Sequence, residues 1–167
     1  MAGVTKTKIG KNLKELDKLY NRSNSNMHKI FYSKLALIEY CGWLENSIDI
    51  LMFRAMKNIS ESTLKKDGES NINRSYGFTF SDHFKGLLIK ILGLSKTQEL
   101  ILWLKQSGDF VVLESKLNNL KTLRNEAAHN YYIGNQAYHS PQFYIQELHA
   151  VYPIFVNIYS FLVKNIR

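Results

Sequence analysis

The stretch Met27–Asn58, MHKIFYSKLALIEYCGWLENSIDILMFRAMKN, decides the fold class of this chain. Apolar residues recur in it every three or four positions, which is the spacing of one helix face. Aromatic residues widen that face, so the predicted helix must be covered on more than one side. We therefore predict a long central helix from about residue 27 to residue 58. Its stripe comprises Ile30, Leu37, Ile38, Cys41, Leu44, Ile48, Leu51, Met52 and Met56, widened by Phe31, Tyr40, Trp43 and Phe53.

Helical spacing continues on both sides of this stretch, and only two Pro and nine Gly interrupt the chain, which suits long helices better than many short strands. Gly93 and Ser107-Gly108 are expected to end helices, and Ser140-Pro141 is expected to begin the last one. Pro153 falls inside that last helix and is expected to kink it. Besides the central helix, we predict a basic N-terminal helix over 8–21, helices over 81–93 and 95–107, one over 110–129, and one from 141 to the C-terminus.

Residues 59–80 lose the helical period and are mostly polar. Asp67-Gly68 and Ser75-Tyr76-Gly77 are turn signals within them. We predict a polar surface loop here, with a short turn of helix at its start. It is not a domain boundary, because neither side would hold a core alone. The chain 1–167 is therefore predicted to be a single all-α domain, a helical bundle of five to six helices.

The charge of the chain favours a polyanionic partner. Its 167 residues carry 22 Lys and Arg against 14 Asp and Glu, a net charge of +8. Such a surface attracts nucleic acid first. Half of the excess lies in residues 1–22, where six basic side chains face two acidic ones. A solvated helix face explains this patch as well as an RNA-binding surface does. The candidate RNA-binding residues are Lys6, Lys8, Lys11, Lys14 and Lys18.

Several classes of protein are disfavoured by composition. The single cysteine, Cys41, excludes an internal disulfide framework and a cysteine-based zinc site, and it favours a reducing, cytoplasmic setting. The first eight residues lack the apolar segment of a secretory signal, and no run of about 18 apolar residues suggests a membrane span. The histidines other than His129 are scattered without the spacing of metal ligands. His83, one of them, is expected to lie at the surface. We therefore expect no cofactor, no metal and no membrane partner.

A second stretch, Leu120–Tyr132 (LKTLRNEAAHNYY), carries the side chains suited to chemistry. Arg124 lies on the apolar line of the predicted helix 110–129, and His129 closes that helix. Five positions in a helix correspond to about 140° of rotation and about 7.5 Å of rise, so these two side chains do not share a face. Either the helix frays or bends near Ala128, or each side chain pairs with groups from elsewhere. A two-fold dimer would supply such groups.

Residues Arg124 to His129 resemble the R-x(4–6)-H motif of the HEPN superfamily, whose members are small all-α domains. Asn125 fits the polar residue that often follows the arginine. A second match, Arg22 to His28, lies in a Ser/Asn-rich break and is treated as accidental. The resemblance covers the helical pattern from about residue 27 onward, although its specific part is only six to eight residues. It implies a metal-independent endoribonuclease of a bacterial toxin–antitoxin or antiviral defence system, acting as a homodimer with two arginines and two histidines in one cleft.

Under this hypothesis the RNA 2′-OH attacks its own phosphodiester. His129 moves the protons, Arg124 stabilises the charge on phosphorus, and Asn125 orients the phosphate or His129. His129 and Tyr131 form an H-x-Y pattern similar to that of toxins whose tyrosine is nucleotidylated, which implies a cognate nucleotidyltransferase antitoxin.

Two alternatives remain open. Tyr131 and Tyr132 suit an aromatic pair covering a helix end equally well. Glu45 flanks the central apolar stripe, and a carboxylate there usually pairs with a cation, for which Arg124 is available. Arg124 would then bridge two helices while His129 caps its own helix. The chain would in that case be a catalytically silent HEPN-like module for RNA binding or dimerisation.

Overall fold

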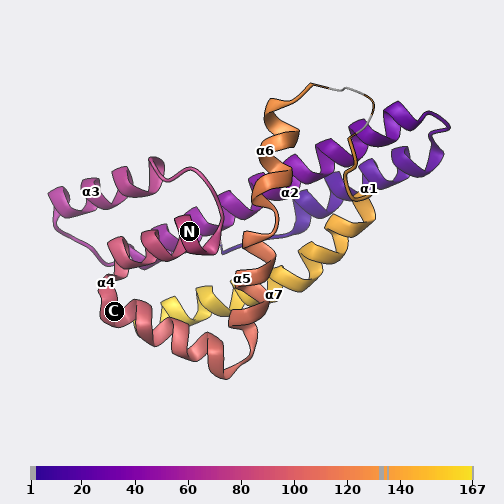
Figure 1. Cartoon of the computed structure of the whole chain (residues 1–167). Helices are drawn as coiled ribbons and strands as arrows, with labels where there is room; N and C mark the ends of the chain where they lie inside the picture. The colour runs from indigo at the N-terminus through magenta and orange to yellow at the C-terminus, as the bar shows by residue number, and fades with distance from the viewer. Residues whose placement is uncertain (1–2, 132–133, 135, 167) are drawn as a thin grey trace.

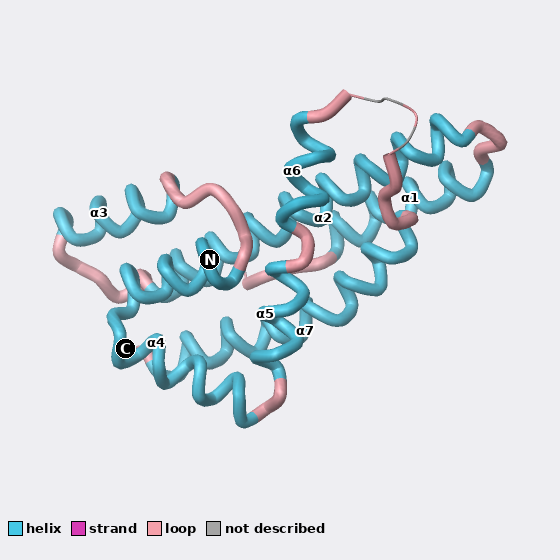
Figure 2. Tube along the Cα trace, in the orientation of Figure 1, coloured by secondary structure: helices cyan, strands magenta, loops and turns pink. Residues whose placement is uncertain are grey.

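The computed structural model describes residues 3–131, 134 and 136–166. All regular structure in these residues is helical, as Figures 1 and 2 show, and the predicted all-α class is confirmed. None of the described helices has both the length and the apolar character needed to cross a membrane. The elements in chain order are α1 (Thr7–Arg22), α2 (Asn26–Ala55), α3 (Ser62–Asn73), the π-helical turn η1 (Phe80–Phe84), α4 (Lys85–Gln106), α5 (Asp109–Asn118), α6 (Lys121–His129) and α7 (Pro141–Asn165).

Helix α2 is the centre of the structure. Leu37, Leu44 and Leu51 follow one another at intervals of seven residues, and each is completely buried. Helices α1 and α7 pack along α2 on different sides and also contact each other (Figure 1). Trp43 of α2 holds the segment ahead of α1 in place, because its Nε1 donates a hydrogen bond of 2.9 Å to the carbonyl of Thr5. The predicted central helix is therefore present, and it ends at Ala55, three residues early.

Helix α4 follows directly on the π-helical turn η1. The amide of Phe84 donates to the carbonyl of Thr79 across five residues, at 2.9 Å, which is the hydrogen bond that defines this wider helix. Phe80 and Phe84 are both buried, and their rings meet edge to face at 5.9 Å. Gly93, at a φ of 76°, interrupts α4 at the predicted helix end. Burial of the two rings thus fixes η1 against the core.

The predicted loop over 59–80 is wrong for residues 62–73, which form α3. Glu61 caps this helix, because its carboxylate accepts hydrogen bonds from the amides of Thr63 and Leu64. Gly68 was expected to turn the chain but lies inside the helix, where a side chain would collide with Met56. Ile72 is buried on the same element. Packing at Gly68 and Ile72 thus stabilises a helix that the polar sequence, which lacks apolar periodicity, did not predict.

The single helix predicted over 110–129 is divided into α5 and α6. The break falls at Asn119 and Leu120, and Asn119 is the second of two successive asparagines, which are weak helix formers. The Asn118 side chain binds Ser81 of η1 twice, donating to its hydroxyl at 3.1 Å and accepting from its amide at 3.3 Å. This contact anchors the end of α5. Helix α6 then runs in a different direction from α5 and packs against α2 (Figure 1).

Leu44→Ala tests the central position of α2. The substitution removes a completely buried side chain, so we expect the free energy of unfolding to fall by about 2–5 kcal/mol. Urea unfolding followed by circular dichroism measures the change. Leu64→Ala on α3 is the matched control, because Leu64 is exposed and its loss should cost less than about 0.5 kcal/mol. Equal losses for the two variants would contradict the central role of α2.

Candidate functional site

Helix α6 carries the motif residues and remains helical through His129. The amide of Arg124 bonds to the carbonyl of Leu120 at 2.9 Å, and the amide of Asn130 bonds to the carbonyl of Glu126 at 3.0 Å. The option that the helix frays near Ala128 is therefore excluded. Arg124 is directed toward α2, whereas His129 is exposed beyond it. Pairing of each side chain with groups from elsewhere stays a prediction.

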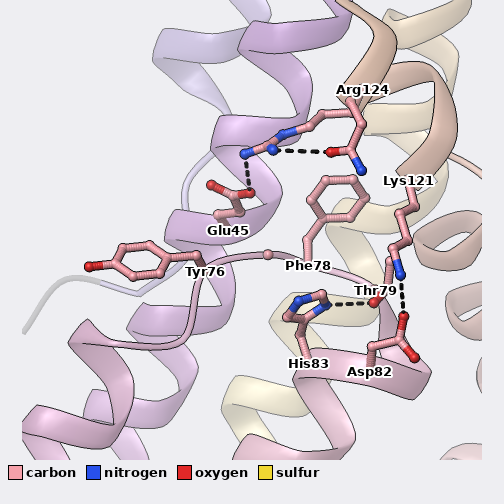
Figure 3. Close-up of a pocket in the computed structure, with 10 residues that line it drawn as sticks. Glu45, Tyr76, Phe78, Thr79, Asp82, His83, Lys121 and Arg124 are labelled. Atoms are coloured by element: carbon pink, nitrogen blue, oxygen red, sulfur yellow. Dashed lines mark hydrogen bonds and ion pairs between the residues drawn. The ribbon is translucent and has the colours of Figure 1, made fainter. Parts of the chain in front are cut away.

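Arg124 forms the predicted ion pair with Glu45. Its Nη2 lies 3.1 Å from Glu45 Oε1, and its Nη1 donates to Asn125 Oδ1 at 3.3 Å (Figure 3). The side chains of Arg124 and Glu45 are 34% and 30% exposed. A pair this accessible contributes about 1 kcal/mol or less to stability. The ion pair joins α6 to α2 and holds the guanidinium in one place, which is its main effect on the site.

Arg124 and Asn125 line a pocket of about 340 Å³, which we call the α6–η1 pocket. Helix α2, the loop before η1, η1 itself and α6 all contribute to its wall. Figure 3 shows the side chains of α6 approaching from one side of the loop and those of η1 from the other. The lining residues are Glu45, Tyr76, Gly77, Phe78, Thr79, Asp82, His83, Lys121, Arg124 and Asn125.

A second ion pair crosses the α6–η1 pocket. Lys121 Nζ lies 2.8 Å from Asp82 Oδ2, and both side chains are about half exposed. The hydrogen bond from Lys121, followed by its charge, lowers the pKa of Asp82. Lys121 and Arg124 are three positions apart on α6, so they lie on the same side of the helix. The pocket thus presents two cations side by side, each held by one carboxylate.

His83 was expected at the surface but is half-buried in the wall of the α6–η1 pocket. Its Nδ1 lies 2.6 Å from the hydroxyl of Thr79. The other side of the ring faces Gly77, where a Cβ atom would lie only 2.7 Å from Nε2. Gly77 also has a φ of 129°, which favours glycine. Sequence spacing gave no signal for His83, because the π-helical turn shifts its direction.

The other motif residues are not brought into this pocket. His129 and Tyr131 are exposed, and Tyr132 lies outside the described residues. Within the described part of the chain the ring of His129 makes no hydrogen bond, so the α6 carbonyls are capped by the Asn130 amide alone. Lys34 Nζ donates to the Asn130 carbonyl at 2.6 Å. This bond ties the end of α6 to α2.

The five basic candidates of the N-terminal segment do not line one groove. Lys6, Lys11 and Lys14 line a groove of about 240 Å³ between α1 and α7, together with His149. Lys8 lines a different recess, which it shares with Glu39. Lys18 is paired with Glu15 at 2.6 Å. Of the five candidates, Lys6, Lys11 and Lys14 therefore share one basic groove.

Comparison with family models, with curated proteins and with solved structures found no match for this chain. Among the described residues, no group of three or more His, Cys, Asp or Glu side chains is arranged to hold a metal ion. The described chain does place a motif arginine, a lysine and a histidine around one pocket. Proton transfer and anion binding are the chemistry that these side chains support.

Asp49→Asn tests the environment one turn beyond Glu45 on α2. Burial, followed by the charge of Glu45, raises the pKa of Asp49 from 3.8 to about 6. The folded state therefore binds more protons than the unfolded state between these pH values, and stability falls as pH rises through about 6. We expect Asp49→Asn to raise the free energy of unfolding by about 1 kcal/mol at about pH 8, since the group is partly screened, and to add nothing below about pH 4. Urea unfolding at both pH values measures it, and an equal effect at both would contradict this environment.

Proposed function

We propose that this protein is a metal-independent endoribonuclease of the HEPN type that acts as a cytoplasmic homodimer in a bacterial toxin–antitoxin or antiviral defence setting. One observation carries the proposal. Helix α6 holds Arg124 and Asn125 at a polar pocket and ends in an exposed His129. The two parts of the R-x(4–6)-H pattern are therefore available to RNA on one short element.

The proposed reaction needs no group that these side chains lack. His129 accepts the proton of the ribose 2′-OH as its oxygen bonds to the adjacent phosphorus. The bond from phosphorus to the 5′-oxygen breaks, and that oxygen takes a proton from a histidine. Arg124 stabilises the negative charge that builds on the phosphate oxygens. The products are a 2′,3′-cyclic phosphate and a 5′-hydroxyl.

An exposed apolar stripe on α2 supports the homodimer. Met27, Leu35 and Ile38 are 41%, 45% and 37% exposed. Their spacing places them on one face of α2, and Glu45 continues the same face seven residues after Ile38. Lys34 holds the end of α6 beside this stripe. We propose that a second copy covers the stripe and that its α6 brings the partner's His129 toward Arg124.

A second candidate function is a catalytically silent RNA-binding or dimerisation module. The observation that favours it is the Glu45–Arg124 ion pair, which occupies part of the guanidinium. RNA would then bind the groove of Lys6, Lys11 and Lys14, with a strong dependence on salt.

Tyr131 is 82% exposed, which would leave it accessible to a nucleotidyltransferase antitoxin under the first function.

Cleavage assays on Arg124→Ala and His129→Ala test the ribonuclease. We expect wild-type protein to cut RNA in the presence of EDTA and to leave 2′,3′-cyclic phosphate ends. Each variant should cut at least about 100-fold more slowly, because a proton carrier or a transition-state cation is lost. His28→Ala, from the accidental motif match, should cut like the wild type. If the wild type leaves RNA intact, or if His129→Ala cleaves RNA as fast as the wild type does, the ribonuclease proposal is wrong and the silent module is favoured.

Leu35→Asp tests the proposed dimer. A carboxylate in the buried centre of the interface carries a large desolvation cost, so we expect a monomer in sedimentation equilibrium and little RNA cleavage. The melting temperature of the chain should change little, since Leu35 is exposed in one copy. Leu94→Asp is the control, because Leu94 is an exposed leucine of α4, far along the chain from the stripe. A wild-type monomer, or a Leu35→Asp dimer, would contradict the assembly.

A further inference from the structure

We propose that the α6–η1 pocket binds one nucleotide of single-stranded RNA, with the phosphate on Lys121 and Arg124 and the base on Tyr76. This inference rests on the proposed function, from which it takes the class of ligand. It assigns the nucleotide to a pocket within one chain, separate from the exposed His129. A volume of about 340 Å³ suits a small ligand of this kind.

The phosphate position follows from the donors of α6. Arg124 uses one bond to Glu45 and one to Asn125, and a guanidinium has five N–H donors. Lys121 is about half exposed at the same wall, with only Asp82 as its described partner. The amide nitrogen of Asn125 adds a donor that has no partner among the described residues. A phosphate between these groups would accept several charge-assisted hydrogen bonds at once.

His83 supplies a further polar atom at this position. Its Nδ1 is held by Thr79, and its Nε2 has no hydrogen-bond partner in the described part of the chain. The ring is confined between Thr79 and Gly77, so its orientation is fixed before a ligand binds. If Thr79 donates to Nδ1, then Nε2 carries a proton and donates to a phosphate oxygen. A fixed ring binds without the cost of ordering a flexible side chain.

Tyr76 provides the base-binding surface. It lines the α6–η1 pocket but is 81% exposed, and Figure 3 shows its ring extending outward from the loop below Glu45. The neighbouring Phe78 is buried and anchors that loop in the core. An exposed aromatic ring beside paired cations is the arrangement with which proteins bind single-stranded nucleic acid, because every base stacks on it. The loop thus presents Tyr76 at the same pocket as the phosphate donors Lys121 and Arg124.

The charges of the pocket determine how tightly a phosphate binds. Arg124 and Lys121 are balanced by Glu45 and Asp82, so an incoming phosphate competes with two carboxylates. Asp82 is the more accessible of these carboxylates, with a side chain 54% exposed. Its removal would leave Lys121 without its described partner and give the pocket a net positive charge. Asp82→Asn should therefore strengthen phosphate binding, a gain that general damage to the fold does not produce.

Calorimetric titration of the full-length His129→Ala protein tests the pocket without cleavage. The probes are adenosine 3′-monophosphate, adenosine, inorganic phosphate and a 2′-O-methyl hexanucleotide. We expect the monophosphate to bind more tightly than adenosine or phosphate alone. In this background Tyr76→Leu should lower the affinity for the monophosphate by about tenfold and leave the affinity for inorganic phosphate unchanged. Tyr76→Phe should retain both affinities. Lys121→Gln and His83→Gln should weaken both by about tenfold, and Asp82→Asn should strengthen both by roughly two- to fivefold.

Lys90→Gln on α4 is the matched control and should bind every probe as the parent does. The inference is overturned if no probe binds, if Tyr76→Leu and Lys121→Gln bind like the parent, or if Asp82→Asn weakens binding. A hexanucleotide that binds independently of these residues also overturns it. If Tyr76→Leu and Lys121→Gln are introduced into the wild type and RNA is still cleaved at the wild-type rate, the ribonuclease proposal stands and the nucleotide pocket is wrong. Nucleotide binding with the expected dependences but without cleavage removes the ribonuclease and leaves the pocket.

Discussion

Burial of α2 on most of its circumference determines where the other helices lie. A thirty-residue helix with Leu37, Leu44 and Leu51 along its centre needs cover on several sides, and α1 and α7 supply most of it. Glu45 lies on the face that these two helices leave open. Helix α6 packs there, so core packing brings Arg124 to Glu45. The partly exposed ion pair is too weak to direct the fold, and it serves to orient a guanidinium that packing has already delivered.

The separation of the two histidines shapes both proposals. His83 shares a pocket with Arg124 inside one chain, while His129 lies beyond the end of that pocket. In the proposed assembly the first would hold substrate and the second, from the partner, would act on it. Because binding and proton transfer would come from different chains, a monomer would retain nucleotide affinity and lack cleavage. Dimerisation would then control the reaction without changing the pocket.

Periodicity predicted the elements that bury a continuous stripe and failed where burial is local. The central helix was visible because its apolar residues repeat over more than seven turns. The Glu45–Arg124 pairing was also predictable, since a carboxylate beside an apolar stripe needs a cation nearby. Helix α3 was missed because only Gly68 and Ile72 of it are buried, and neither makes a periodic signal. His83 was missed for another reason, namely that its direction depends on a π-helical turn that single-sequence spacing does not encode.

The π-helical turn η1 makes chain length, in addition to residue type, a determinant of the pocket. A π turn holds one residue more than an α turn within nearly the same rise. Loss of one residue between Thr79 and Phe84 would restore an ordinary α turn while the buried Phe84 kept its place in the core. The shorter α turn would span nearly the same rotation, so the loop before it would keep its place, whereas Asp82 and His83 would be lost or would point in new directions relative to Arg124. Related chains that differ by one residue at this point would share the bundle and differ in what the pocket accepts.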